Sequence, residues 1–119
     1  MAPPVARVRG VEPTKSIKVL VAADSPYAVR AEDDYYLADC TGGPVTVVVP
    51  AVQSLLKAHT PVQRTLLLKK IDPTGNAATF QASGPDLIDG AATLVITTQY
   101  QARTIINDLN PSVVGWWVV

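Results

Sequence analysis

The chain has 119 residues, is 48% hydrophobic, and carries ten basic and ten acidic side chains that cancel. This length predicts one domain with a substantial apolar core, and the balanced charge gives no reason to expect a nucleic acid or an anionic membrane as partner. The single cysteine excludes an intrachain disulfide. No apolar run reaches the length of a transmembrane helix, and the first ten residues lack the apolar stretch of a signal peptide.

Residues 1–16 differ in composition from the rest of the chain. They hold three prolines and three basic residues but only one acid, Glu12. This composition is typical of an extended N-terminal arm rather than a packed element. Two interpretations stay open: a terminus without a role, or an arm that orders on a partner surface through Val5, Arg7, Val8 and Arg9.

From residue 17 onward, short apolar runs alternate with Gly, Pro and Asp turns, which predicts a single β domain over residues 17–119. Helical spacing occurs only in residues 52–59, for at most two turns. We therefore expect an all-β fold, an antiparallel β-sandwich or jelly-roll-like module behind the extended arm. The predicted strands lie near residues 17–22, 34–38, 44–49, 64–71, 77–82, 92–97, 101–107 and 113–119.

Alternation within these strands predicts which side chains share a face. Val45, Val47 and Val49 fall on one face, and Trp116 and Trp117 must point apart. Several strands are apolar on both faces. Either these strands are central and buried, or their outer faces pack in an oligomer.

Residues with reactive side chains are few, and their spacing matches no catalytic or metal site. His59 is the only histidine and falls on the apolar stripe of residues 52–59, so we interpret it as structural. A Cys40–His59 nucleophile pair is the alternative to Cys40 as a small apolar filler. Glu32-Asp33-Asp34 lacks the spaced ligands of a calcium loop and is interpreted as a solvated turn.

The remaining acids sit mostly in turns, where Asp bonds to its own backbone. Paired carboxylates could hydrolyse glycosides, but no convergent pair is evident. We expect no catalytic residue, no cofactor, no metal site and no enzyme. The Tyr35-Tyr36 and Trp116-Trp117 pairs could instead line a sugar or protein groove, or place one ring in the core and the other at an interface.

A series of turn and strand motifs follows in order along residues 33–119. They are Thr41-Gly42-Gly43 before a strand that ends at Pro50, Lys69–Asp72, Gly75–Phe80, Ile88-Asp89-Gly90 and Trp116–Val119. This order resembles the small all-β module of phage head-fibre, tail-fibre and tail-spike proteins. Gly42-Gly43 and Asp89-Gly90 are the dipeptides whose backbone freedom such tight turns require.

The resemblance implies a structural protein of a virion that is put together in the host cytoplasm. It favours a homotrimer that decorates the capsid as a cement or head-fibre protein, with the major capsid protein or another virion protein as its partner. One of Trp116 and Trp117 would then lie at or near the subunit interface. A tail-fibre or tail-appendage component, or a carbohydrate- or receptor-binding module, remains an alternative.

Overall fold

The computed structural model describes residues 17–30, 33–56, 63–108 and 115–119. These residues form ten strands, one short helix, α1 (Val52–Leu56), and one 3-10 turn, η1 (Ala22–Asp24). The strands are β1 (Ile17–Val21), β2 (Tyr27–Ala28), β3 (Tyr35–Asp39), β4 (Val45–Val48), β5 (Thr65–Lys70), β6 (Ala78–Gln81), β7 (Leu87–Ile88), β8 (Thr93–Ile96), β9 (Ala102–Asn107) and β10 (Gly115–Val118).

The all-β expectation is confirmed, because all eight predicted strands coincide with observed ones. The sequence pattern missed β2 and β7, which have only two residues each and cannot show a period. The predicted helix begins at Val52 as expected, and its part beyond Leu56 falls outside the described residues, as does the arm over residues 1–16.

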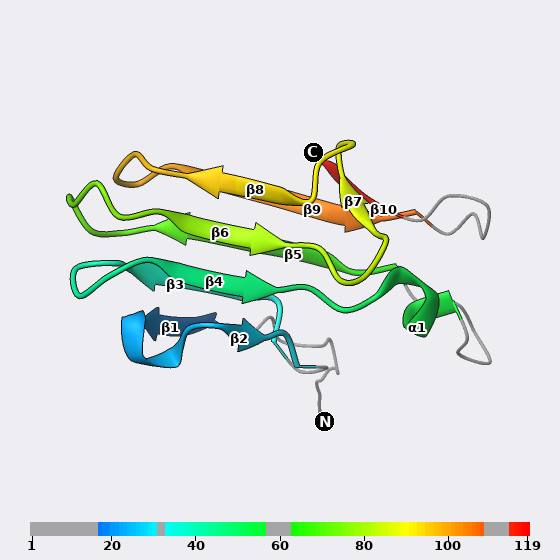
Figure 1. The fold of residues 1–119 in the computed structure, drawn as a ribbon, viewed down its shortest axis with the longest axis horizontal. Coiled ribbons are helices and arrows are strands. Elements are labelled where there is room, and N and C mark those ends of the chain that lie inside the picture. Colours follow the sequence, from blue (N-terminus) through cyan, green and yellow to red (C-terminus); the bar gives the residue numbers. More distant parts are fainter. Residues whose placement is uncertain (1–16, 31–32, 57–62, 109–114) are drawn as a thin grey trace, which may run out of the picture.

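The strands form two mixed sheets around one core. The six-stranded sheet has the order β1-β3-β5-β9-β10-β7, and the four-stranded sheet has the order β2-β4-β6-β8. Buried side chains from both sheets belong to a single hydrophobic cluster. In Figure 1, accordingly, the two sheets lie one behind the other, with the turns after β1, β3, β5 and β8 aligned at the left end.

From β1 to β6 the chain alternates between the two sheets. Each pair of consecutive strands forms one coil, and the next coil stacks on it in parallel, as in β1–β3–β5 and β2–β4–β6. Only then do β8 and β9 pair antiparallel with β6 and β5. Among the described residues five of the eight strand pairs are parallel, β7 with β10 included, so the expectation of antiparallel pairing is wrong for these pairs. Turns such as Gly42-Gly43 lead from one sheet to the other instead of closing a hairpin.

The predicted alternation of faces is confirmed. Val45, Val47 and Val49 are fully buried, whereas the intervening Thr46 and Val48 are partly exposed. Trp116 and Trp117 point apart: the first is 1% exposed and the second 45% exposed. The periodicity of single strands thus placed the core correctly even though the pairing of strands differed.

The Asp89-Gly90 turn is also formed as predicted. Both residues have positive φ, 49° and 82°, and the flanking Ile88 and Ala91 exchange hydrogen bonds of 2.6 and 3.0 Å. The Asp89 carboxylate then accepts the N–H of Val118 at 3.0 Å, which ties this turn to the C-terminal strand. The sequence signal identified a real two-residue turn.

A buried ion pair joins the turns at one end of the two sheets. The Lys70 ammonium lies 2.6 Å from the Asp72 carboxylate, and both side chains are almost fully buried, at 0% and 2% exposed. The other oxygen of Asp72 accepts the N–H of Cys40 at 2.7 Å, and Thr74 donates to the carboxylate through its N–H and its hydroxyl. Asn76 completes the network by donating to the carbonyl of Cys40 at 2.8 Å.

This network controls the ionisation of Asp72. Burial alone would raise the pKa of the carboxyl, but the hydrogen bonds from Lys70, Thr74 and Cys40 outweigh it and hold the pKa well below its usual value. A carboxyl with a lowered pKa in the folded state stabilises the fold at pH values above the pKa of the unfolded chain, about 3.9. That contribution is lost as the pH falls below this value.

We expect Asp72→Asn to lower the melting temperature strongly at neutral pH, because it leaves the buried ammonium of Lys70 without its counter-ion. The difference from wild type should shrink as the pH drops below about 4, where the wild-type carboxylate begins to lose its advantage. Thermal unfolding followed by circular dichroism from pH 7 to pH 2 measures both effects. Asp39→Asn is the control, since the hydrogen bonds that this carboxylate makes within the described residues go to the neighbouring Thr41; a pH-independent difference for Asp72→Asn would contradict the account.

Gly115 supplies a second test of the packing. A Cβ placed on it would meet the carbonyl oxygen of Leu87 at 2.7 Å, so only glycine lets β10 approach β7. We expect Gly115→Ala to lower the free energy of unfolding by about 1–3 kcal/mol, measured by urea denaturation. Gly75→Ala should change it little, because no atom lies within 4 Å of that Cβ position and φ is not positive. Equal effects of the two substitutions would argue against the close approach.

Candidate interaction surface

The one described candidate for a nucleophile, Cys40, is buried within the fold. Cys40 is fully buried, and its thiol points at the carbonyl oxygen of Ala77, 3.6 Å away. Burial, and then the nearby Asp72 carboxylate, raise the pKa of this thiol, which keeps it protonated and unreactive. His59 lies outside the described residues, so the Cys40–His59 alternative stays a prediction.

Several carboxylates bind backbone N–H groups, and the described carboxylates do not converge on a site. Asp24 accepts the N–H of Val21, Asp86 that of Val52, and Asp89 that of Val118. Asp33 accepts the hydroxyl of Tyr27 at 2.5 Å, while Glu32 falls outside the described residues. Within the described ranges, His, Cys, Asp and Glu side chains form no group of three that could hold a metal ion, and no pocket is found.

Apolar side chains gather instead on the outer face of the six-stranded sheet. Paired residues of neighbouring strands point to the same side, so the register defines this face. We call it the apolar face, and its nonpolar side chains are Ile17, Val19, Val21, Tyr35, Leu37, Leu67, Leu87, Ala102, Ile106, Trp117 and Val119. Asp39 and Lys69 are the charged residues that the paired strands place there.

The exposed hydrophobic side chains are distributed unevenly between the two outer faces. Eight large hydrophobic side chains of the described chain are exposed, and six of them lie on the apolar face. Six strands spaced about 4.8 Å apart give this face roughly 400 Å² in projection. This is the area of the whole face, its polar side chains included, and the exposed hydrophobic side chains lie at its two edges, on β1 and on β7 and β10. Apolar patches of a few hundred Å² on soluble proteins often serve as interaction sites.

The outer face of the four-stranded sheet has a different character. Its rows read Ala28–Val48–Gln81–Thr93 and Thr46–Thr79–Val95, so hydroxyl and amide groups dominate. Val95 is its one exposed large hydrophobic side chain, at 52%. The two outer faces are thus chemically distinct, and only one has the composition of a protein interface.

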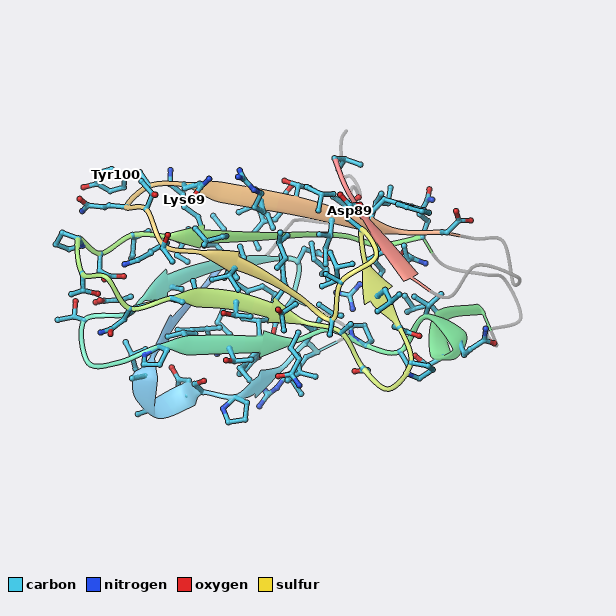
Figure 2. The ribbon with its side chains drawn as sticks, turned by 45° about the horizontal axis from the view of Figure 1, so that its top comes forward. Lys69, Asp89 and Tyr100 are labelled. Carbon is cyan, nitrogen blue, oxygen red and sulfur yellow. The ribbon has the colours of Figure 1, made fainter. Side chains whose placement is uncertain are left out.

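Two exposed aromatic rings border or belong to the apolar face. Trp117 is held in place because its indole N–H donates to Asp108 at 3.0 Å. Tyr100, in the turn between β8 and β9, is 65% exposed, and the Lys69 ammonium lies 5.9 Å from the centre of its ring. Figure 2 shows Tyr100 and Lys69 together at the turn end, far along the sheet from Asp89.

The predicted interface residues are placed only in part. Trp116 is in the core beneath the six-stranded sheet, so Trp117 is the member of the pair that a partner can reach. Val5, Arg7, Val8 and Arg9 lie outside the described residues. Strands with two apolar faces are visible in the sequence, but only the strand order joins their outer faces into one surface.

Comparison of the chain with protein-family models and with curated proteins gives no match. The resemblance of residues 33–119 to phage fibre modules therefore stays a prediction. Within the described residues, no helix has the length and apolar character needed to cross a membrane.

The apolar face can be tested with two matched valines. Val19 and Val95 are both exposed strand residues, at 56% and 52%, but on opposite outer faces. We expect the wild-type protein to be oligomeric by light scattering, and Val19→Lys to reduce its mass to that of the single chain, 12.6 kDa, because a lysine buried at an interface loses its hydration. Val95→Lys should leave the mass unchanged. A wild-type monomer, or equal effects of the two substitutions, would remove the apolar face as an interface.

Proposed function

We propose that this protein is a structural, non-enzymatic component of a bacteriophage particle. It decorates the capsid surface as a cement or head-fibre protein, and its two sheets act as a β-sandwich module. The observation that carries the proposal is the concentration of exposed hydrophobic side chains on one sheet face. A protein that works by packing against copies of itself and a shell needs such a face.

The use of the polar side chains supports a structural role. Asp24, Asp72 and Asp86 bind backbone N–H groups at strand ends and turns, and the buried Lys70 neutralises the buried carboxylate of Asp72. These interactions stiffen the ends of strands. The order of the motifs over residues 33–119 resembles that of phage fibre modules. This resemblance narrows the proposal from a rigid β module to a virion appendage.

The proposed assembly is a homotrimer in which the apolar face, including Trp117, packs between subunits. Its partner on the particle is the major capsid protein or another virion protein, and the neutral net charge gives no reason to add nucleic acid. A location on a tail fibre or tail appendage would use the same face in the same way. The trimer stabilises the shell by mass action, since it binds only the assembled lattice.

A second candidate function is carbohydrate or receptor binding, which the exposed rings of Trp117 and Tyr100 favour. Sugar rings stack on such aromatic faces. Titration with oligosaccharides would quench the fluorescence of Trp117 but not that of the buried Trp116. Loss of the quenching in Trp117→Phe would assign it to the exposed ring and support this alternative.

We expect particles that lack this protein to assemble and package DNA but to rupture at a lower temperature or under milder osmotic shock. The physical reason is the loss of bridging contacts between shell subunits. Heating particles with and without the protein, and measuring DNA release, tests this. Failure to form any shell would indicate a core capsid role, and normal heads without tails would indicate the tail location.

A further inference from the structure

The exposed hydrophobic side chains of the apolar face form two patches at opposite edges of the sheet. The first patch, which we call the β1 row, consists of Ile17, Val19 and Val21. The second, which we call the Trp117 patch, lies on β7, on β10 and just after it, and consists of Leu87, Trp117 and Val119. Figure 1 shows β1 at one edge of the molecule and β7 and β10 at the other. The apolar side chains on the strands between the two patches are only partly exposed.

Ile17 and Val119 lie at the two ends of a single row across the sheet. Ile17 pairs with Tyr35, and Tyr35 pairs with Leu67. Leu67 pairs with Thr104, whose carbonyl accepts the N–H of Val119 at 2.9 Å. Four strand spacings of about 4.8 Å therefore separate Ile17 from Val119, about 19 Å in all. These two residues are also the most exposed members of their patches, at 65% and 72%.

We infer that the β1 row of one copy packs against the Trp117 patch of the next copy, around a closed ring of three. The inference rests on the homotrimer proposed above. A contact between like patches would join two copies by a two-fold axis and leave the other patch of each copy uncovered. A contact between unlike patches covers both patches of every copy when the ring closes. Rotation about an axis along the strands keeps each row at its level, so Ile17 meets Val119 of the neighbouring copy.

The size of the patches favours a ring over a single pair. At about 200 Å² for a large side chain, exposures near one half give each patch roughly 300 Å² of accessible surface. Stable pairs of proteins usually bury about 800 Å² on each partner, so one such contact is weak. A ring gives every copy two contacts and also covers the side chains between the patches. Trp117 is suited to anchor each contact, because its hydrogen bond to Asp108 already holds the ring in place.

The width of the face fits three copies. Six strands at about 4.8 Å make each face about 29 Å wide. Three such faces, joined edge to edge with their outer sides inward, enclose a triangle whose centre is about 8 Å from each face. Packed sheets lie about 10 Å apart, so each contributes about 5 Å of side chain, and larger residues such as Tyr35 reach further. Four copies would place the centre about 15 Å from each face, too far for side chains to fill.

Site-directed crosslinking tests this contact in the full chain. We expect Ile17→Cys/Val119→Cys, treated with a short bismaleimide, to run as a covalent trimer on a denaturing gel, because each contact joins position 17 to position 119 of the next copy. A link within one chain would have to span about 19 Å. The matched control is Ile17→Cys/Val95→Cys, whose second site is exposed on the opposite outer face and should stay unlinked. The wild-type chain gives the background, since its one thiol, Cys40, is buried.

The single substitutions distinguish the geometries of contact. Chains with Ile17→Cys alone, or with Val119→Cys alone, should stay unlinked, because like positions lie at different corners of the ring. A covalent dimer from either single substitution overturns the inference, and so does a double variant that never exceeds the dimer or that forms bands larger than a trimer. An unlinked double variant that keeps the wild-type oligomer mass by light scattering also overturns it but leaves the self-association standing. A monomeric wild type overturns both.

Discussion

The Lys70–Asp72 ion pair is the interaction on which the arrangement of this fold depends. It is buried at the end of β5, the strand that pairs parallel with β3 on one side and antiparallel with β9 on the other. A buried ion pair by itself adds little stability, because both charges give up their hydration. Here the carboxylate also binds the N–H of Cys40 and the turn at Thr74, so one charged group holds the ends of β3 and β5 together. The pair thereby defines how one coil of chain stacks on the previous one.

Local sequence predicted local structure well in this protein. Strand positions, the side chains that each strand buries, and the Asp89-Gly90 turn all follow from periodicity and turn chemistry, which act over a few residues. The pairing of strands was not predictable in this way, because a glycine turn looks the same whether it closes a hairpin or leads to the opposite sheet. The parity of β5, which places Lys70 on the same side as Leu66 and Leu68, was a signal in the sequence for the buried lysine. The apolar face needed the strand order, so no single segment could reveal it.

The proposed interaction surface and the polar network that ties the strand ends lie in separate parts of the molecule. The polar groups are concentrated where strands end and serve the backbone, while the surface available to partners is mostly hydrocarbon. A face of this kind distinguishes partners by shape and by the few charges on it, Asp39 and Lys69, rather than by a dense set of hydrogen bonds. The contrast with the threonine-rich opposite face gives the molecule an inner and an outer side, as a protein needs if it attaches to a surface in one orientation.

The burial of Cys40 has a practical consequence. It is the only cysteine of the chain, and its backbone is held on both sides by Asp72 and Asn76. An alkylating reagent can reach this thiol only when the end of β3 separates from the turn after β5. The rate of alkylation of Cys40 therefore reports how often this one junction opens. It allows the junction to be followed in the wild-type sequence without an introduced cysteine.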